Sequence, residues 1–408
     1  MLNDLEVARF RDETPGCANV THFNHAGASL MPAPVVDAVI GHVQREAEIG
    51  GYEAADEAED RLENVYDTIA RLICADRSEI AVVENATRAW DMAFYGIPFQ
   101  AGDRILTSIA EYASNVIAFL HVAERGVAID VVPNDETGQL SVEALRHMID
   151  DRVKVVAVSH MPTNGGLVQP AAEIGRVCRE AGSMFVLDAC QTVGQMPIDV
   201  TQIGCDVLSA TSRKFLRGPR GVGFLYVRSE IGDRITPPFL DLHAATWTAR
   251  DRYEVRNDAR KFENWEFNVA GKLGMGVAAD YAMAVGLDAI WVRVRHTAEH
   301  LRASLAEIPG VSVCDLGDVK GGIVTFAVDG IPSEDVRNRL FTQRFNTTLS
   351  SVDSTRYDME ARGLTELVRA SVHYLTTSEE CVRLASAVSD IASRRSQSSR
   401  SVQSTLSG

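Results

Sequence analysis

The sequence lacks the cysteine spacing of a disulfide framework or a zinc site. Its 408 residues include seven cysteines, and none of them forms a CxxC pair. An odd number of cysteines without paired spacing favours a reducing compartment. No stretch reaches about 18 consecutive apolar residues, and the N-terminus has no basic region followed by an apolar run. We therefore expect a cytoplasmic protein with no metal site, no transmembrane helix and no signal peptide.

Basic residues are also scarce relative to acidic ones. The chain carries 40 lysines and arginines against 56 aspartates and glutamates, which gives a formal net charge of −16. Such a surface repels phosphate backbones, which argues against nucleic-acid binding. Hydrophobic residues make up 46% of the chain, as in ordinary globular proteins. The length predicts two domains, or one large domain with a small one appended.

The middle of the chain alternates short apolar runs with amphipathic segments. The runs are rich in Val, Ile, Leu and Phe, as in strands that are buried on both faces. Helical spacing of apolar residues lies between them at 36–43, 62–69 and 174–181. Strands are predicted at 80–85, 104–108, 128–133, 153–160, 183–190, 205–210 and 221–227. This alternation predicts an α/β architecture with a mixed, mostly parallel sheet between layers of helices.

The pattern changes after about residue 264. A long helical stretch, roughly 268–306, leads into further helix–strand alternation up to about residue 393. We expect a large domain at 21–264 and a small C-terminal α+β domain at 265–392, with residues 1–20 packing on the small domain. The Ser-rich segment 393–408 has almost no apolar content and is predicted to be disordered.

Three chemically useful residues fall at predicted strand ends. Asp188 ends the segment VLDAC, Lys214 follows the strand near 205–210, and Thr87 lies where a strand turns into a helix. Ligands of open α/β sheets bind beyond the carboxyl ends of strands. Taken singly, each residue has an ordinary explanation as a turn residue, a loop lysine or an N-cap. The segment SRKFLRGPRGVGFLYV changes that balance, because a lysine followed by Gly-Pro-x-Gly-x-Gly and a buried strand is a specific arrangement.

The chemistry of pyridoxal 5′-phosphate (PLP) needs such a set. The cofactor requires a lysine amine, for which Lys214 is the candidate. Its ring nitrogen requires a buried carboxylate, for which Asp188 is the candidate. Its phosphate requires a helix N-terminus with hydroxyl and cationic donors, and Thr87, Thr211 and Arg213 fit that need.

Six segments in order resemble the class V aminotransferase family, which includes cysteine desulfurases, isopenicillin N epimerase-like proteins and carbon–sulfur lyases. The segments are EYASNVIAF, MPTNGGLVQPAAEIG, DACQTVGQMPIDV, TSRKFLRGPRGVGFLYV, RKFENWEFNVAG and LVRASVHYLTTSEE, and the likeness covers roughly residues 20 to 390. The resemblance implies the type I fold of PLP-dependent transferases. It also implies a homodimer with active sites at the subunit interface, acting on a small amino acid.

The resemblance also implies a role for each matching residue. Lys214 would hold PLP as a Schiff base and shuttle the proton, and Asp188 would pair with the ring nitrogen. Arg369 would bind the α-carboxylate of the substrate, which suits a planar guanidinium. The remaining implied contacts are Gln191 to the phenolic oxygen, Ala86, Thr87, Thr211 and Arg213 to the phosphate, and Asn24, Ala26 and Gly27 along the substrate site.

Three positions depart from the family pattern. Tyr112 stands where the desulfurases stack a histidine on the cofactor ring, and tyrosine is a poor acid–base group near neutral pH. Thr163 stands where they place an asparagine near the phenolic oxygen. Asn264-Trp265-Glu266 replaces the Ser-Gly-Thr that reaches the neighbouring subunit's phosphate, so the Trp265 indole N–H is the candidate substitute. We expect structural roles for His25 and His160.

A nucleophilic cysteine is missing from the segment where the desulfurases carry theirs. Residues 347–364 contain no cysteine. The leading hypothesis is therefore a β-eliminating carbon–sulfur lyase that acts on an S-substituted cysteine or its sulfoxide. The segment EAEIGGYEAADEAED (46–60) adds to it, since it resembles class V lyases of thiol-containing natural-product pathways. The alternatives are an aminotransferase, an epimerase or a decarboxylating enzyme, then a cysteine desulfurase, and lastly a catalytically silent protein of the same fold.

Overall fold

A seven-stranded sheet forms the centre of the computed structural model, which describes residues 2–405 and the side chains of residues 2–393. The strand order is β2-β8-β7-β6-β5-β3-β4, and β8 is antiparallel to both neighbours while the other pairs are parallel. The strands are β2 Ile80–Val83, β3 Arg104–Ser108, β4 Ala128–Val132, β5 Val153–Ser159, β6 Met184–Asp188, β7 Val207–Thr211 and β8 Gly223–Val227. Each predicted strand is confirmed to within a residue or two, and so is the mixed, mostly parallel sheet.

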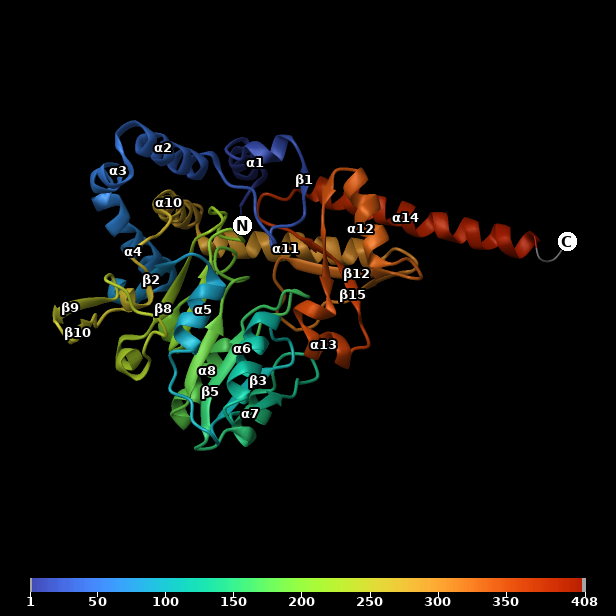
Figure 1. Cartoon of the computed structure of the whole chain (residues 1–408). Helices are drawn as coiled ribbons and strands as arrows, with labels where there is room; N and C mark the ends of the chain where they lie inside the picture. The colour runs from blue at the N-terminus through green and yellow to red at the C-terminus, as the bar shows by residue number, and fades with distance from the viewer. Residues whose placement is uncertain (1, 406–408) are drawn as a thin grey trace.

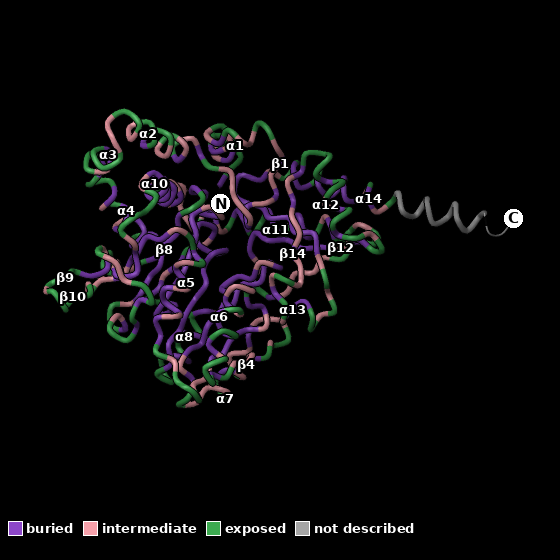
Figure 2. Tube along the Cα trace, viewed as in Figure 1, coloured by how far each residue is buried: buried purple, intermediate pink, exposed green. Residues whose placement is uncertain are grey.

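Helices cover both faces of this sheet (Figure 1). Alternate residues of a strand point to opposite faces, and β5 shows it: Val156 and Val158 pack with one set of helices, whereas Val155 and Ala157 pack with the other. The first set is α4 Glu59–Ile73, α7 Val142–Met148, α8 Ala171–Ala181, α9 Val200–Ile203 and α10 Val269–Val285; the second is α5 Ala86–Phe94 and α6 Ala113–Ala123. Burial on both faces explains the continuous apolar runs of the sequence (Figure 2).

A second, antiparallel sheet lies in the C-terminal part of the chain. Its order is β11-β12-β15-β14. The strands are β11 Val311–Val313, β12 Ile323–Val328, β14 Thr348–Ser351 and β15 Glu366–Ser371, and the helices around them are α11 Leu287–Ala306, α12 Ser333–Thr342, α13 Arg356–Ala361 and α14 Ser378–Thr405. Most of this sheet shares an apolar cluster with α11, α12 and α14. The tail predicted to be disordered, 393–408, lies almost wholly outside the residues whose side chains are described.

The helical stretch expected at 268–306 is two helices rather than one. Gly286 separates α10 from α11 and has a φ of 93°, a left-handed conformation that suits glycine. The axes of the two helices meet at 79°. By length and composition the bent pair could cross a membrane, but no single helix among the described residues is long and apolar enough to do so. Met275 and Ala279 of α10 pack into the core of the large sheet, although α10 lies beyond the predicted domain boundary at 264–265.

The N-terminal residues pack against α11 and Tyr374. Val7 and Phe10 of α1 Asp4–Asp12 contact Ile290 and Val294 of α11, together with Tyr374. The short strand β1 Thr21–His22 then pairs with β13 Phe345–Asn346. The remaining elements are α2 Ala33–Ile49, α3 Gly51–Glu57 and the hairpin β9 Ala245–Ala249 and β10 Arg252–Val255. The domain limits themselves stay a prediction.

Candidate active site

The carboxyl ends of three parallel strands converge at one edge of the large sheet. In register, Asp188 at the end of β6 lies opposite Ser159 at the end of β5 and Ser209 of β7. Lys214 comes three residues after β7 ends at Thr211. The edge is where α/β sheets bind ligands, so topology alone brings Asp188, Thr211 and Lys214 together.

A tight turn holds Lys214 in place. The N–H of Arg217 donates to the Lys214 carbonyl at 2.9 Å, and the N–H of Gly218 donates to the Ser212 carbonyl at 2.8 Å. Arg217 has a φ of 63°, which is uncommon for a residue with a side chain. Its guanidinium offsets that cost by donating to the Thr14 hydroxyl at 2.6 Å, the Leu30 carbonyl at 3.0 Å and the Tyr374 hydroxyl. The sequence analysis did not identify Arg217.

The surroundings of Lys214 oppose its charge. Burial is the largest effect and lowers the pKa of its amine, Cys190 and Asp188 raise it, and Arg213 and Arg369 lower it again. These effects also place Asp188, Arg213 and Arg369 within electrostatic reach of the amine. A lysine with a lowered pKa has more of the neutral form that acts as a nucleophile or base.

Asp188 is buried and held by two donors. Its Oδ1 accepts the N–H of Cys190 at 2.9 Å, and its Oδ2 accepts the amide of Asn115 at 3.3 Å. The Cys190 thiol is buried beside it, and this burial raises the pKa of that thiol. Asp188 therefore has a fixed orientation and, among the described residues, no cationic side chain as a hydrogen-bond partner, as expected of a carboxylate that pairs with a protonated ring nitrogen.

Glu111 is a site residue that the sequence analysis missed. It is 1% exposed and ties together three elements of the site. Its carboxylate accepts the Ser159 hydroxyl at 2.5 Å, the Ser159 N–H at 2.9 Å, the Tyr112 N–H at 2.9 Å and the Asn115 amide at 2.8 Å. Asn115 thus bridges Glu111 and Asp188. Burial raises the pKa of Glu111 to about 7, although these hydrogen bonds lower it. An acid three residues after a buried strand was the available signal.

The proposed phosphate end of the site lies where α5 begins. Gly223 of β8 pairs with Thr211, and a Cβ on Gly223 would lie 2.5 Å from the Ala210 carbonyl oxygen and 3.2 Å from the Ala86 nitrogen. Glycine therefore lets the N-terminus of α5, with Ala86 and Thr87, approach Thr211. The first amides of a helix have no partner within the helix and attract anions.

The segment expected along the substrate site crosses the same edge. The Ala26 N–H donates to the Ser371 hydroxyl at 2.9 Å, and the Ala26 carbonyl accepts the Gln191 amide at 3.2 Å. The Asn24 side chain lies over Gly27, because a Cβ on Gly27 would be 2.5 Å from Asn24 Oδ1. Asn24, Ala26, Gly27 and Gln191 therefore lie together.

Arg213 lies on the substrate side of this arrangement. Its guanidinium donates to the Gly27 carbonyl, and its own carbonyl accepts the Ser29 N–H at 2.8 Å. The charge of Arg213 lowers the pKa of both Lys214 and Arg369, so Arg213 lies near both residues. Its expected contact with the phosphate stays a prediction.

Arg369 lies in the middle of the small sheet. On β15 it pairs with Thr325 of β12 and Thr348 of β14. Its Nη1 donates to the Thr163 carbonyl at 3.1 Å and to the Thr163 hydroxyl. Burial, together with the charge of Arg213, lowers the pKa of Arg369 to about 10, so the guanidinium stays charged at neutral pH. Thr163, expected near the cofactor's phenolic oxygen, is thus a hydrogen-bond partner of Arg369, the residue expected to bind the substrate's α-carboxylate.

The other expected residues differ in their surroundings. Tyr112, 37% exposed, is the N-cap residue of α6 and lies near enough to Arg369 to affect its pKa. Trp265 is 50% exposed, and its backbone N–H donates to the Asp241 carboxylate at 2.7 Å. The side chain lines a separate cavity of about 560 Å³ with Tyr52, His243 and Phe267. Within one chain, Trp265 is not among the residues that interact with Lys214.

His25 and His160 are buried, as expected for structural residues. His160 Nδ1 lies 3.1 Å from the Thr192 hydroxyl, and burial lowers the pKa of His160 to about 4. His25 lies between His22 and His373, with ring centroids 4.7 and 5.1 Å away. His373 Nε2 donates to the carbonyl of Phe215, the residue after Lys214, at 2.8 Å. His373 therefore supports the backbone of the lysine segment, and burial lowers the pKa of both His25 and His373, which keeps the two imidazoles neutral.

Several buried polar atoms at this edge have no protein partner among the described residues. They are Oε1 of Gln191, Oδ1 of Asn24 and Nε of Arg369. Buried polar groups are ordinarily hydrogen-bonded, so an amide oxygen, a guanidinium nitrogen, a lysine and a fixed carboxylate together fit PLP with an amino-acid substrate. The fold and these residues define a PLP-dependent enzyme of the type I fold.

The chain belongs to the class V aminotransferase family, whose model, described as "Aminotransferase class-V", matches residues 21–384. A probable cysteine desulfurase of Methanothermobacter thermautotrophicus is 29% identical over 390 residues, which cover 94% of this chain and 97% of that protein. A probable hercynylcysteine sulfoxide lyase of Mycobacterium tuberculosis is 29% identical over 389 residues, which cover 94% and 93%. PLP is the cofactor of the enzyme, as the sequence predicts.

Solved structures agree on the fold. The apo cysteine desulfurase of Thermococcus onnurineus NA1 has a TM-score of 0.89 at 24% identity, covering 95% of this chain and 98% of that one. The cystine C–S lyase C-DES, solved with its reaction product cysteine persulfide, has a TM-score of 0.84 at 23% identity, covering 92% and 99%. At these identities the likeness confirms the type I fold.

Proposed function

We propose that the enzyme is a carbon–sulfur β-lyase. Its substrate would be an S-substituted cysteine or a cysteine sulfoxide, and its products a thiol or sulfenate, pyruvate and ammonia. The observation that carries this proposal is the absence of cysteine from residues 347–364. A desulfurase needs a mobile thiol there to take the sulfur atom, whereas β-elimination needs only a base and a leaving group.

The chain's own residues have distinct roles in this proposal. Arg369 binds the α-carboxylate, and its Nε is free of protein partners to do so. The amine of Lys214 removes the Cα proton, a step whose general-base contribution is about 10²–10⁴-fold. When bound, PLP supplies the electron sink for the resulting carbanion. Asp188, fixed by Cys190 and Asn115, keeps the cofactor's ring nitrogen protonated.

Cys190 and Cys314 are poorly suited to accept sulfur. Cys190 is buried under Asp188, and burial raises the pKa of its thiol, which disfavours the reactive thiolate. Cys314 is partly exposed, but its thiol pKa is also raised by burial. Its carbonyl is held at 2.5 Å by Arg362, which limits movement of that loop. No thiol on the segment before Arg369 therefore competes with elimination.

Cysteine desulfurase is the second candidate. The names of the relatives favour it, since several of them are probable cysteine desulfurases at 27–29% identity. The lyase reading draws support from the relative named hercynylcysteine sulfoxide lyase, which is equally similar at 29%. The same cofactor contacts also serve transamination, epimerisation and decarboxylation, so products must decide.

Product analysis separates these reactions. The PLP-loaded enzyme is given L-cysteine, S-alkyl-cysteines and their sulfoxides, and the products are quantified by mass spectrometry. We expect pyruvate and ammonia in equal amounts from the S-substituted substrates. Alanine with protein-bound persulfide from L-cysteine would instead establish a desulfurase. A keto acid or aldehyde that retains sulfur would overturn the lyase proposal in favour of transamination or decarboxylation.

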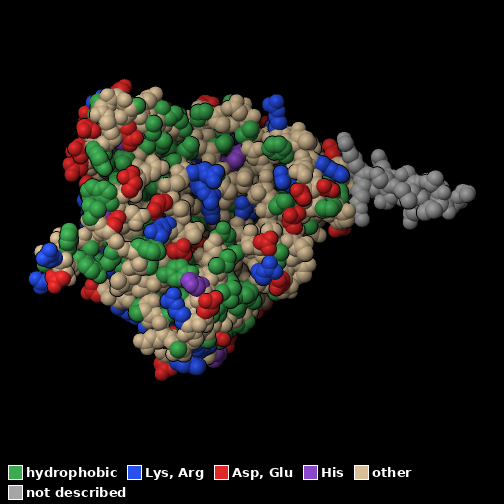
Figure 3. All heavy atoms as spheres, viewed as in Figure 1, with side chains coloured by type: hydrophobic (Ala, Val, Ile, Leu, Met, Phe, Trp, Pro, Cys, Tyr) green, Lys and Arg blue, Asp and Glu red, His purple; other side chains and the backbone are tan. Residues whose placement is uncertain are grey.

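We also propose that the enzyme is a homodimer in which Trp265 reaches the partner's cofactor site. Trp265, Tyr52 and Phe267 are exposed around the 560 Å³ cavity between the α2–α3 corner and the segment that starts α10. Figure 3 shows acidic and apolar side chains over the α2–α3 corner. Light scattering should give twice the chain mass of 44.5 kDa. A fully active monomer would contradict this arrangement.

A further inference from the structure

A chain of buried hydrogen bonds connects α13 to the guanidinium of Arg369. Asp358 of α13 is 3% exposed and accepts the amide of Asn164 at 2.5 Å. Asn164, 2% exposed, directly follows Thr163, whose carbonyl and hydroxyl both accept Nη1 of Arg369. Residues 347–364 therefore reach Arg369 in two ways. Thr348 pairs with it on the neighbouring strand, and Asp358 is linked to its guanidinium through Asn164 and Thr163.

Arg362 completes the contact from α13. Its Nη1 donates to Asp358 at 3.1 Å, and its Nη2 donates to the Cys314 carbonyl at 2.5 Å. The charge of the Asp358 carboxylate is therefore balanced locally. A buried carboxylate with a cation and an amide as partners has one orientation, because losing either partner would leave it unsatisfied.

The Thr163–Asn164 loop is also held from the small sheet. The Thr325 hydroxyl lies 3.2 Å from the Asn164 carbonyl and 2.7 Å from Asp315. Asp315 forms a buried ion pair with Arg302 at 2.7 Å. Thr325 pairs with Arg369 on the neighbouring strand. Both the loop and the arginine are therefore anchored to the same sheet. Asp358, on α13, holds the loop from outside that sheet.

These contacts determine which edge of the guanidinium is available. Nη1 is occupied by Thr163, while Nε is buried and has no partner among the described residues. A carboxylate binds a guanidinium best in a planar, bidentate contact, which requires a fixed plane. If the Thr163–Asn164 loop moved, Nη1 would lose its partner and the plane would rotate.

We propose that Asp358 is a positioning residue for recognition of the substrate's α-carboxylate, acting through Asn164 and Thr163 on Arg369. This inference rests on the carboxylate-binding role assigned to Arg369 under the proposed function. It gives the segment 347–364 a function of its own: in place of a mobile thiol, it braces the carboxylate site. With its plane fixed in this way, Arg369 binds amines that carry an α-carboxylate more tightly than amines that lack one.

The test measures binding, so it does not depend on which reaction follows. PLP-loaded enzyme is titrated with L-alanine, which has an α-carboxylate but no β leaving group, and with ethylamine, which has neither. The change in cofactor absorbance gives a dissociation constant for each. Asp358→Ala should weaken L-alanine binding about tenfold, equivalent to about 1.4 kcal/mol, and leave ethylamine binding within about twofold. With a turned-over substrate, KM should rise while kcat changes little.

Two further variants make the result specific. Asp358→Asn keeps an oxygen for the Asn164 amide and should restore L-alanine binding to within about threefold of wild type. Glu360→Ala removes an exposed partner of Arg356 on the same helix and should change neither ligand. Should Asp358→Ala not fold, Asn164→Ala breaks the same chain and should show the same selective loss.

Unchanged L-alanine binding in folded Asp358→Ala, or an equal loss for L-alanine and ethylamine, would overturn the positioning role. If Arg369→Ala also left L-alanine binding unchanged, the carboxylate assignment itself would fail. Products of a desulfurase in the earlier experiment, with the binding pattern intact, would overturn only the lyase proposal.

Discussion

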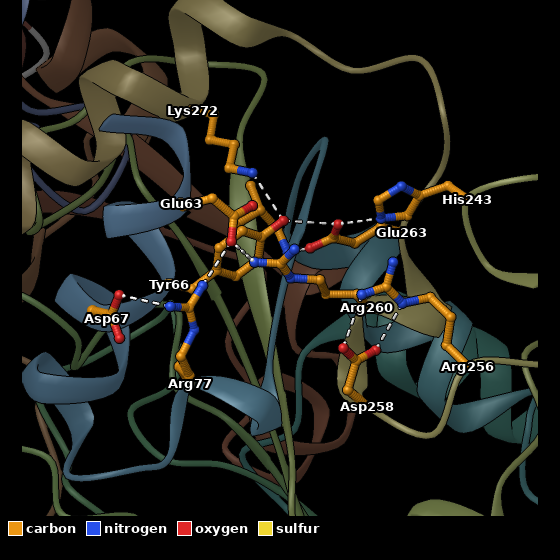
Figure 4. A network of polar contacts seen from close by, with 11 residues as sticks. Glu63, Tyr66, Asp67, Arg77, His243, Arg256, Asp258, Arg260, Glu263 and Lys272 are labelled. Atoms are coloured by element: carbon orange, nitrogen blue, oxygen red, sulfur yellow. Dashed lines mark hydrogen bonds and ion pairs between the residues drawn. The ribbon is translucent and has the colours of Figure 1, made fainter. Parts of the chain in front are cut away.

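Two buried polar clusters in this chain contain a lysine and a carboxylate, yet they differ in how completely their partners are satisfied. The first is the active-site cluster, with Lys214 and Asp188. The second, which we call the Tyr66 network, surrounds Tyr66, Glu263, Lys272 and His243 (Figure 4). In the active-site cluster, Gln191, Asn24 and Arg369 each have a buried polar atom with no hydrogen-bond partner among the described residues. In the Tyr66 network, none of these four side chains has a buried polar atom that lacks a hydrogen-bond partner among the described residues.

The Tyr66 network is closed by its own hydrogen bonds. Glu263, 6% exposed, accepts the Tyr66 hydroxyl at 2.9 Å, the Val82 N–H at 2.6 Å and His243 Nε2 at 2.9 Å. The Lys272 amine donates to the Tyr66 hydroxyl at 2.8 Å. Burial lowers the pKa of Lys272 to about 8, just as burial lowers that of Lys214. A perturbed lysine is thus an ambiguous sign of catalysis, and the unmet hydrogen bonds around it are the better guide.

The largest expected effect separates the two lysines. Lys214→Ala should reduce the elimination rate by at least about 10²–10⁴-fold, because the general base is lost. Lys272→Met should keep the rate per folded molecule and instead lower the free energy of unfolding by about 1–3 kcal/mol, since the Tyr66 hydroxyl loses a partner. Steady-state rates and urea unfolding of both variants measure this. A folded but inactive Lys272→Met, or an active Lys214→Ala, would contradict the assignment of catalysis to Lys214 and of stability to Lys272.

The next effect concerns stability alone. Glu263→Ala should lower the free energy of unfolding by about 3–5 kcal/mol, because Tyr66, Val82 and His243 lose a shared acceptor. Its neighbour Glu266 is exposed, and Glu266→Ala should change stability by no more than about 0.5 kcal/mol. Chemical denaturation of the two variants gives the difference. Equal losses would mean that the Tyr66 network is not the structural centre that its hydrogen bonds indicate.

The smallest effect is a pH dependence below neutral pH that we expect from Glu111 of the active-site cluster. Burial raises the pKa of Glu111 from 4.5 to about 7, so the native protein holds a proton that the unfolded chain releases between these values. Stability therefore falls as pH rises from about 4.5 to 7, by up to about 3 kcal/mol, and is constant above. Glu111→Gln lacks this pH-dependent contribution to the free energy of unfolding, because glutamine does not titrate.

The measured quantity is the difference in unfolding free energy between Glu111→Gln and wild type, both without cofactor. It should increase with pH across this window, in favour of the variant. A difference that stays flat from pH 5 to 8 would mean that Glu111 is ionised throughout, held so by the hydrogen bonds that its carboxylate accepts.

The sequence was sufficient for the strands and for the residues next to them. Apolar runs buried on both faces predicted the seven strands, and Asp188 and Lys214 followed from their places at strand ends. Glu111 was overlooked because its importance lies in the partners that meet it from three elements. The tether from Asp358 to Asn164 joins residues 194 positions apart, and no local pattern reveals such a pair.

Two features of the structure depend on backbone conformation or on tertiary contacts that the sequence pattern does not show. The helix expected over 268–306 is interrupted because Gly286 adopts a left-handed conformation, which periodicity alone does not show. Arg213 lies beside Lys214 as expected, but its side chain turns toward the Gly27 carbonyl, a contact between distant segments. Side-chain direction within a correctly placed segment depends on tertiary partners and is therefore beyond reach of the sequence pattern.

The most direct test of the site is to find which lysine carries the cofactor. The enzyme is loaded with PLP, reduced with borohydride to make the lysine–cofactor bond permanent, digested and mapped by tandem mass spectrometry. We expect the modification on Lys214 in the peptide that contains Phe215 and Leu216. A modification on Lys272, with Lys214 unmodified, would contradict the assignment and move the active site to the Tyr66 network.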